Sequence, residues 1–294
     1  MGEAFITRRG GGGSKVTIDG ESYNDALNLI TQYMDLDKSP LPCEFYNGCA
    51  VVLDNEIHIL DGEGGYNHYK YDGASWIEVS TLPYDFYNGC AVVLDNEIHI
   101  LGGSDNTTNH YKFDGSSWMQ ISILPYDFVY GSAVVLDGEI HILGSGEGES
   151  DNYTKHYKYN GIYWESVSTL PYDFLEGSAV VLNNEIHILG SGNSRTTHYK
   201  YTGSSWKKVS TLPYNFYEGS AVVLNNEIHI LGGTSNATKH YKFNSTSWAS
   251  VSTLPYGFYE GEAVILDNEI HILGGNGGNT EYYIINAKIY KEVA

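Results

Sequence analysis

One sequence phrase occurs six times in this chain of 294 residues. The copy AVVLDNEIHILGG spans residues 91–103, and near-copies follow Gly48, Gly131, Gly177, Gly219 and Gly261. A Leu-Pro pair precedes each copy, at steps of 41, 42, 46, 42 and 42 residues, and the pairs begin at Leu41, Leu82, Leu124, Leu170, Leu212 and Leu254. A period of this length indicates that the chain repeats one supersecondary unit.

The second copy predicts four strands. Residues 89–94 are small, β-branched and apolar, as in a strand buried on both faces. Asp95-Asn96 tolerates positive φ and predicts a two-residue hairpin turn into a second strand over 97–101. After a glycine-rich loop, residues 110–113 and 118–121 predict strands three and four. Four antiparallel strands in a unit of about 42 residues are typical of a propeller blade.

The apolar run that ends in Gly-Gly, then a Tyr, then a Trp seven residues later, resembles the kelch repeat. Five copies keep the interval, at Tyr69/Trp76, Tyr111/Trp118, Tyr157/Trp164, Tyr199/Trp206 and Tyr241/Trp248. The sixth copy has Tyr283 and Tyr290, and three doublets vary, to Asp61-Gly62, Gly144-Ser145 and Gly190-Ser191. The resemblance covers residues 41–294 and implies an all-β fold, a six-bladed β-propeller of four-stranded antiparallel blades.

The repeats divide the chain into a leader, attachment or closure segment over 1–40 and a propeller over 41–294. The expected blades are about 41–81, 82–123, 124–169, 170–211, 212–253 and 254–294. The last copy aligns through Val293 with the fourth strands of the others. Outside the repeats, Lys15–Ile18 can form a strand, and residues 33–36 resemble the Trp-x-x-Val pattern of strand four. Alternatively, residues 25–34 form a short amphipathic helix.

Composition narrows the class of protein. The chain has 26 tyrosines and 34 glycines, which favours β-structure. Its net charge of -20 would repel a phosphate backbone, so no nucleic-acid partner is expected. No apolar run approaches the roughly 20 residues that cross a bilayer, and the first residues lack a conventional secretion signal. Cys43, Cys49 and Cys90 are an odd set, and we expect small buried thiols.

The histidines recur in register, and all 11 lie in the repeats. Two groups stand in strands two and three, at His58, His99, His141, His187, His229 and His271, and at His68, His110, His156, His198 and His240. Two histidines in a blade can form a metal site. A feature of every blade more simply serves the architecture, so structural hydrogen bonds are expected. Glu147, Glu149 and Asp151 lack a standard calcium spacing. We therefore expect no metal and no cofactor.

The differences between copies gather on one face of the predicted disc. Loops that join strands two to three and four to one share this face, whereas the opposite face carries nearly uniform two-residue turns. All length variation lies in the two-to-three loops, the longest of which is GSGEGESDNYTK over 144–155. The residue pairs that precede the innermost strands vary most, and they are Tyr46-Asn47, Tyr87-Asn88, Val129-Tyr130, Leu175-Glu176, Tyr217-Glu218 and Tyr259-Glu260.

These variable positions are predicted to surround the mouth of the central channel and to bind a ligand. Loops on a rigid scaffold commonly carry binding, and tyrosine adds apolar area and a hydroxyl at low entropic cost. The predicted ligand-binding residues are Tyr46, Tyr87, Tyr130, Glu176, Tyr217, Glu218, Tyr259, Glu260, Asp151, Tyr153 and Arg195. The alternative is that the tyrosines only close the end of the channel.

Some proteins of the kelch type are enzymes. A copper radical oxidase needs two histidines at the channel mouth, and none falls there. A sialic acid mutarotase needs cationic groups, and Arg195 is the only arginine of the repeats. Glu176, Glu218 and Glu260 can form an acid/base pair, but carboxylates on adjacent blades also occur as plain surface charge. We expect a protein that is not an enzyme.

We therefore expect a recognition module that binds a glycan or a surface protein. An intracellular scaffold for protein–protein interaction is the alternative, and a carbohydrate-active enzyme comes third. The start GEAFITRRGGGGS resembles leaders of tail-associated phage and prophage proteins of Gram-positive bacteria. That resemblance implies a tail adhesin attached to a virion through its N-terminus. A disordered leader on a cytoplasmic kelch protein fits the same residues.

Overall fold

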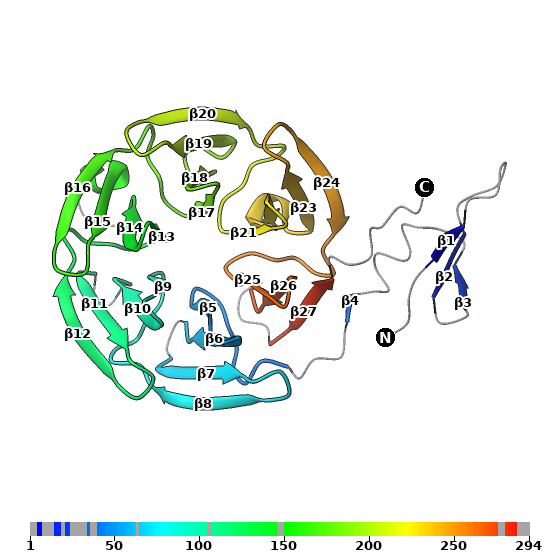
Figure 1. Ribbon diagram of the computed structural model, residues 1–294, viewed down its shortest axis with the longest axis horizontal. Helices are drawn as coiled ribbons and strands as arrows, with labels where there is room; N and C mark the ends of the chain where they lie inside the picture. The colour runs from blue at the N-terminus through cyan, green and yellow to red at the C-terminus, as the bar shows by residue number, and fades with distance from the viewer. Residues whose placement is uncertain are drawn as a thin grey trace.

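The chain forms six four-stranded antiparallel sheets arranged in a ring (Figure 1). This confirms the all-β six-bladed propeller. The computed structural model describes residues 5–7, 15–18, 21–23, 34–35, 40–62, 65–104, 107–145, 150–275 and 280–286. Glu147 and Glu149, for which no calcium site was expected, lie outside these residues.

The first strand of each blade faces the centre of the ring and the fourth forms the outer wall (Figure 1). The first blade comprises β5 (Cys49–Leu53), β6 (Glu56–Leu60), β7 (Asn67–Tyr71) and β8 (Trp76–Thr81). The second comprises β9 (Cys90–Leu94), β10 (Glu97–Leu101), β11 (Asn109–Phe113) and β12 (Trp118–Ile123). The third comprises β13 (Ser132–Leu136), β14 (Glu139–Leu143), β15 (Lys155–Tyr159) and β16 (Trp164–Thr169). A 3₁₀ helix, η1 (Ser150–Thr154), precedes β15.

The fourth blade comprises β17 (Ser178–Leu182), β18 (Glu185–Leu189), β19 (Thr197–Tyr201) and β20 (Trp206–Thr211). The fifth comprises β21 (Ser220–Leu224), β22 (Glu227–Leu231), β23 (Lys239–Phe243) and β24 (Trp248–Thr253). The sixth comprises β25 (Glu262–Leu266), β26 (Glu269–Leu273), β27 (Tyr282–Asn286) and β4 (Met34–Asp35). The 3₁₀ helix η2 (Thr234–Asn236) precedes β23.

Local turn chemistry sets the first hairpin of each blade. Asp95 and Asn96 have φ of 51° and 63°, the conformation of a type I′ turn, whose twist matches that of the flanking strands. The turn places Glu97 opposite Leu94, and the register continues to Leu101 opposite Cys90. This register puts the apolar side chains of both strands into the interface with the neighbouring blades.

The core consists of six apolar clusters, each formed where two blades meet. In one of them Phe86, Ile98 and Ile100 of the second blade are fully buried against Leu60 of the first. Because each blade buries its faces only against its neighbours, closure of the ring completes the burial of apolar area.

The first glycine of the doublet permits close contact between blades. Gly102 has φ of 62°, and a Cβ at this position would collide with the carbonyl oxygen of Phe128 in the next blade. The neighbouring Gly103 N–H donates to that same carbonyl at 3.0 Å. The doublet therefore has an architectural role.

The repeated histidines form structural hydrogen bonds, as expected. His99 Nδ1 lies 2.9 Å from His110 Nε2, and His110 Nδ1 lies 2.7 Å from Ser122 Oγ. The indole of Trp164, in the next blade, donates to the same Ser122 Oγ at 3.0 Å. Burial lowers the pKa of His99 to about 4 and of His110 to about 3, so both rings are neutral at pH 7.

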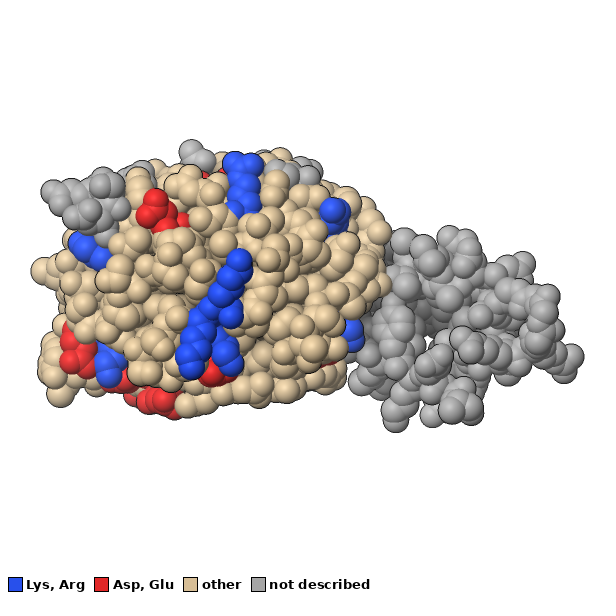
Figure 2. Space-filling model, turned by 90° about the horizontal axis from the view of Figure 1, so that it is seen from above, with Lys and Arg blue, Asp and Glu red and all other residues tan. Residues whose placement is uncertain are grey.

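Basic side chains pair with acidic ones across strands two and three. Lys112 Nζ lies 2.8 Å from Glu97 Oε2, and four further blades repeat the pair. Figure 2 shows lysine and arginine side chains at several places on the side of the disc, including one continuous run near its middle, with acidic side chains close to some of them. These half-exposed pairs contribute little stability, about 0–1 kcal/mol each.

The N-terminal segment contributes two separate elements. β1 (Phe5–Thr7), β2 (Lys15–Ile18) and β3 (Glu21–Tyr23) form an antiparallel sheet of their own. Lys15–Ile18 is thus a strand, but not of a blade. β4 pairs with β27, with Met34 opposite Ile285 and Asp35 opposite Ile284. The rest of the alternative helix over 25–34 and the expected fourth strand near Val293 lie outside the described residues.

Candidate functional site at the channel mouth

Six residues at one repeat position surround the channel mouth, and we call them the rim ring. They are Asn47, Asn88, Tyr130, Glu176, Glu218 and Glu260. All six have a left-handed backbone, with φ between 55° and 59°. Asn adopts this conformation readily, whereas Tyr and Glu do so at an energetic cost.

Backbone hydrogen bonds close the rim ring. The N–H of each member donates to the carbonyl of the member in the preceding blade, from Asn88 to Asn47 and on around to Asn47 to Glu260. All six bonds measure 2.7–2.8 Å. Since the left-handed conformation aligns these groups, the ring fixes six Cα positions and directions while leaving the side chains free to differ.

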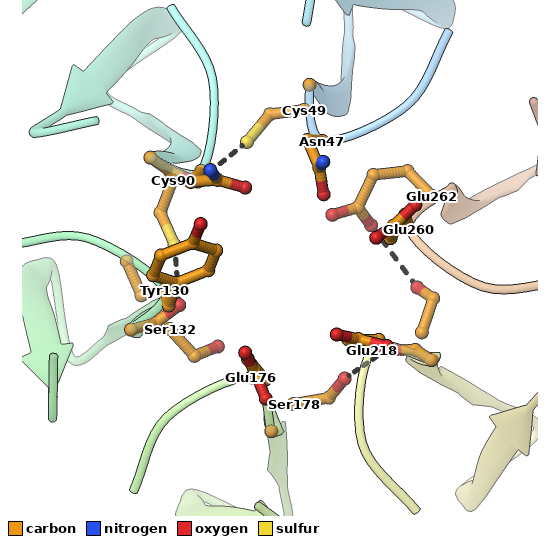
Figure 3. Close-up of a pocket in the computed structure, with 18 of the residues that line it drawn as sticks. Asn47, Cys49, Cys90, Tyr130, Ser132, Glu176, Ser178, Glu218, Glu260 and Glu262 are labelled. Carbon is orange, nitrogen blue, oxygen red and sulfur yellow. Dashed lines mark hydrogen bonds between the residues drawn. The ribbon is translucent and has the colours of Figure 1, made fainter. Parts of the chain in front are cut away.

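The side chains of the rim ring enclose a cavity of about 310 Å³. Figure 3 shows the carboxylates of Glu176, Glu218 and Glu260 directed toward the centre, with Asn47 and Tyr130 on the other side. The fourth, fifth and sixth blades therefore supply a carboxylate half, and the first three blades supply an amide and phenol half. The cavity offers acceptors on one side and both donors and acceptors on the other.

A second layer, the inner ring, lies at the first residue of each innermost strand. It consists of Cys49, Cys90, Ser132, Ser178, Ser220 and Glu262. Most of its groups bond to neighbouring blades: Cys49 Sγ donates to the carbonyl of Gly89 at 3.2 Å, and Ser220 Oγ donates to Glu262 Oε2 at 3.2 Å. Burial raises the pKa of the Cys90 thiol to about 12, which makes it unreactive.

Two carboxyl groups of the cavity, those of Glu218 and Glu262, ionise less readily than usual. Burial, followed by repulsion from Glu176 and Glu260, raises the pKa of Glu218 to about 7, and Arg195 offsets part of this rise. Burial also raises the pKa of Glu262 to about 7, although the bond from Ser220 opposes it. The charge of the cavity therefore changes near neutral pH.

Arg195 and Tyr217 lie together beside the rim ring. The Arg195 guanidinium lies 4.4 Å from the centre of the Tyr217 ring, a cation–π contact, and its Nε donates to the carbonyl of Gly192 at 2.9 Å. Thr234 Oγ1, in η2, donates to Glu218 Oε2. Two-to-three loops thus position the only arginine of the repeats and one hydroxyl next to the carboxylates.

Some of the predicted site residues line the cavity and others do not. Tyr130, Glu176, Glu218 and Glu260 line the cavity. Four tyrosines one position before a rim-ring residue are half-buried and do not line it, namely Tyr46, Tyr87, Tyr217 and Tyr259. Tyr153 is half-buried in η1, where its carbonyl accepts a bond from Phe174 N–H at 2.9 Å, and Asp151 belongs to the same 3₁₀ helix.

Asn47, Asn88 and Glu262 line the cavity but were not among the predicted ligand-binding residues. Asn47 and Asn88 belong to the variable pairs that were predicted to surround the channel mouth, and they hold the same repeat position as Glu176. Glu262 stands where other copies have Cys or Ser, and this single exception was the available signal. Its depth in the channel depends on the propeller and is not visible in the sequence.

Among the residues that the structure describes, no group of three or more His, Cys, Asp or Glu side chains is placed to hold a metal ion. Within the same described ranges, no helix has the length and apolar character required to cross a membrane.

Comparisons with known proteins identify a fold but no family. No family model matches the chain, and no curated protein matches its sequence. A solved structure titled "Structure of YjhT" is similar, with a TM-score of 0.74 and 16% sequence identity, over 86% of this chain and 97% of that chain. At this identity the similarity supports the kelch-like propeller fold alone.

Proposed function

We propose that this propeller is a non-catalytic recognition module that binds a glycan at the channel mouth. The observation that carries the proposal is the rim ring. One hydrogen-bonded backbone circle holds six side chains of different chemistry toward a single cavity. Positions that served only ring closure would be expected to repeat like the rest of the blade.

The chemistry of the cavity favours a saccharide. Carboxylates and amides accept and donate the hydrogen bonds that hydroxyl groups require. The volume of about 310 Å³ is at the lower end of small-ligand sites and suits a terminal sugar unit. The Tyr217 ring beside the mouth adds an aromatic surface, although Arg195 covers one of its faces.

Backbone strain at the mouth also supports a functional role. Tyr130, Glu176, Glu218 and Glu260 hold a left-handed conformation that Asn47 and Asn88 adopt at lower cost. Side chains retained in such conformations cluster at binding and active sites.

One observation favours a second candidate, a carbohydrate-active enzyme. Glu218, with a pKa of about 7, stands beside two further carboxyl groups in the cavity, the arrangement of a general acid and its partner. An enzyme would convert the bound saccharide, and Glu218→Gln would abolish turnover while retaining affinity.

A glycan array followed by calorimetry tests the proposal. Glu218→Gln and Glu176→Gln remove charged acceptors and should lower affinity about tenfold or more. Thr246→Ala, an exposed change in a turn on the opposite face, is the matched control and should bind like the parent. The site is rejected if both cavity variants retain full affinity for every glycan that the parent binds.

The proposed context is a phage or prophage tail adhesin held on a particle by its N-terminal segment. Two observations support it: the leader resemblance, and the assembly of β1, β2 and β3 into a sheet separate from the blades. Tail or baseplate genes beside this gene would support the context. A neighbourhood of cytoplasmic signalling genes, with a protein partner and no glycan bound, would favour the scaffold instead.

A further inference from the structure

The outer walls of the blades differ in charge. In the first five blades the lysine at the fourth position of strand three pairs with the glutamate of strand two, as Lys200 Nζ does with Glu185 Oε2 at 2.7 Å. Further charges come from the turn between strands three and four and from the first half of strand four. On the first and fourth blades these further charges have opposite signs.

The wall of the fourth blade is basic. Lys207 and Lys208, in β20, are exposed, and neither forms an ion pair within the described residues. Lys207 also lies directly opposite Lys200 in the register of β19 and β20. Figure 2 faces this wall, since β20 lies at the top of Figure 1, and shows a continuous run of basic side chains near its middle. Like charges at opposite positions destabilise a pair of strands, so the stability of the blade does not explain this wall.

The architecture of a blade does not require these lysines either. At the same two positions the other complete fourth strands have Ile77-Glu78, Met119-Gln120, Glu165-Ser166 and Ala249-Ser250. In the third blade, Glu165 at the position of Lys207 forms an ion pair with Lys158 at 3.1 Å. Lysines protect some strand edges from pairing with other chains, but β12 and β24 are also outermost strands and contain no charged residue. The two lysines are therefore specific to the wall of the fourth blade.

The wall of the first blade is acidic. Glu78, in β8, stands at the repeat position of Lys208, and Asp72 lies in the turn that precedes β8. Both side chains are exposed, and neither forms an ion pair with another described residue. Asp72 Oδ1 accepts two backbone N–H groups of its turn at 2.8 and 2.9 Å, which lowers the pKa of the carboxyl and keeps it ionised at pH 7. The fourth blade has the uncharged Thr202 at the position of Asp72.

These two walls lie on opposite sides of the disc. In a ring of six blades, two blades separate the first from the fourth on either side, and Figure 1 shows β8 and β20 at opposite edges. A second copy of the chain, placed beside the first, can therefore bring Asp72 and Glu78 against Lys207 and Lys208. Ile77, which is 43% exposed next to Glu78, adds apolar area to such a contact.

The net charge of -20 does not prevent this approach at moderate salt. At an ionic strength of about 0.1 M, exposed charges more than about 10 Å apart are largely screened from one another. The repulsion between whole molecules is then weak beside the attraction of opposite charges at the contact.

We propose that the outer wall of the fourth blade binds the outer wall of the first blade in a second copy of this chain. The contact joins two different surfaces on opposite sides of the disc, so each copy binds two others and the discs associate side by side in open rows. Copies related by translation present their channel mouths on the same side, and several mouths together bind a surface ligand with increased avidity. The association extends the proposed function but does not depend on it.

Sedimentation velocity of the full chain tests this proposal. The parent should form oligomers that grow with protein concentration at about 0.1 M salt and dissociate at about 1 M salt. Lys207→Glu/Lys208→Glu and Asp72→Asn/Glu78→Lys each bring like charges together and should each lower the association constant by at least about tenfold. Asn at position 72 preserves the turn, because Asn160 and Asn244 accept the same turn N–H groups in the third and fifth blades.

A mixture of the two wall variants gives the sharpest test. Each variant alone should be monomeric, whereas the mixture should associate, because the acidic fourth blade of one variant meets the basic first blade of the other. Ala249→Glu/Ser250→Glu, the same double change at the same positions of the fifth blade, is the matched control and should associate like the parent. Melting curves verify that every variant is folded.

A parent that stays monomeric at about 0.1 M salt and protein concentrations up to about 1 mM overturns the proposal. Association that persists in either wall variant alone overturns it, and so does a mixture that remains monomeric. These measurements require no ligand. Loss of glycan binding in the cavity variants with the rows intact would reject only the binding site, and a monomer that binds glycan would reject only the rows.

Discussion

At the residue scale, the rim ring separates backbone role from side-chain role. Asn88 and Glu176 have φ of 58° and 55° and make the same type of backbone bond to the preceding blade, yet present an amide and a carboxylate. The hydrogen-bonded ring therefore constrains the backbone at these positions, whereas the side chains differ from blade to blade.

Two substitutions at Glu176 test the energetic cost of the left-handed backbone conformation in the rim ring. Glu176→Asn should give a free energy of unfolding about 1 kcal/mol larger than Glu176→Ala, because Asn tolerates the left-handed region. Denaturant titration measures both. At Glu165, in β16, where φ is not positive, Asn should show no advantage over Ala. Equal stabilities at position 176 would contradict the argument from strain.

The buried carboxyl of Glu262 gives a pH-dependent prediction. Its pKa is about 7 in the fold and 4.5 in the unfolded chain, so stability falls as pH rises from 4.5 to 7. Glu262→Gln should therefore be more stable than the parent at pH 8, by on the order of 2 kcal/mol, and equal at pH 4.5. Melting curves at both pH values measure this. A difference in stability between Glu262→Gln and the parent that stays constant with pH would refute the assigned protonation of Glu262.

Ligand affinity, through Glu218, should change with pH in the opposite direction to stability through Glu262: it should rise as pH rises. If its carboxylate accepts bonds from sugar hydroxyls, affinity is full above a pH of about 7 and declines as the group is protonated at lower pH. Calorimetry between pH 8 and pH 5.5 should show this decline in the parent and a flatter profile in Glu218→Gln. A parent profile with no dependence on pH would exclude this role.

At the scale of strands, a serine links two blades. Ser80 Oγ, in β8, lies 3.0 Å from His68 Nδ1 and accepts the indole N–H of Trp118 at 3.0 Å. The same arrangement recurs at three further junctions. At the sixth-to-first junction, Trp76 Nε1 is buried with no hydrogen-bond partner among the described residues.

Ser80→Ala should lower the free energy of unfolding by about 2 kcal/mol, because it removes the partner of the buried His68 ring and of the half-buried Trp118 indole. The adjacent exposed Thr81→Ala is the control and should change stability by less than about 0.5 kcal/mol. Ser80→Thr should restore part of the loss, since it keeps a hydroxyl. Chemical denaturation measures all three. Equal losses of stability at positions 80 and 81 would contradict a stabilising role for the hydrogen bonds of Ser80.

At the scale of the whole molecule, ten of the eleven buried histidines have a lowered pKa, which makes the stability of the ring sensitive to acid. Five strand-two members, all except His271, have a pKa of about 4 and the five strand-three members have a pKa of about 3, against 6.5 in an unfolded chain. Below pH 6.5 the unfolded chain binds more protons than the fold. Stability is therefore lost progressively as pH falls from 6.5 toward 3.

Thermal melts from pH 7 to pH 4 should show a steep fall in melting temperature within this window. His99→Gln/His110→Gln, which replaces one pair, should reduce the slope while lowering stability at pH 7. Lys207→Gln, which removes an exposed lysine in β20, is the control and should leave the slope unchanged. A melting temperature that is independent of pH between 6.5 and 4 would rule out this account.

Most of the fold was predictable because its determinants are local. The apolar runs on either side of the Asp95-Asn96 turn, the turn itself and the repeated spacing specify each blade, and six copies specify their number. The strands observed at β9, β10, β11 and β12 agree with those expected for this copy to within two residues at their ends. The structural role of the histidines followed from their presence in every blade.

The candidate site was predictable only to the level of a loop. Variation between copies singled out the pairs before the innermost strands, but it did not distinguish Tyr217 from Glu218 as the residue that faces the cavity. That distinction depends on the left-handed backbone at position 218 and on its bond to Glu176, both of which require the assembled ring.

The sequence by itself determined the blade, its strand order and the face on which the copies differ, because turns and side-chain alternation act over a few residues. Only the tertiary structure decided which variable side chains share one cavity, how deep Glu262 lies and that β4 pairs with β27. These features depend on contacts between residues far apart in the chain, as with Asp35 and Ile284. The resemblance of residues 33–36 to strand four indicated a strand, but no local pattern identifies the strand with which it pairs.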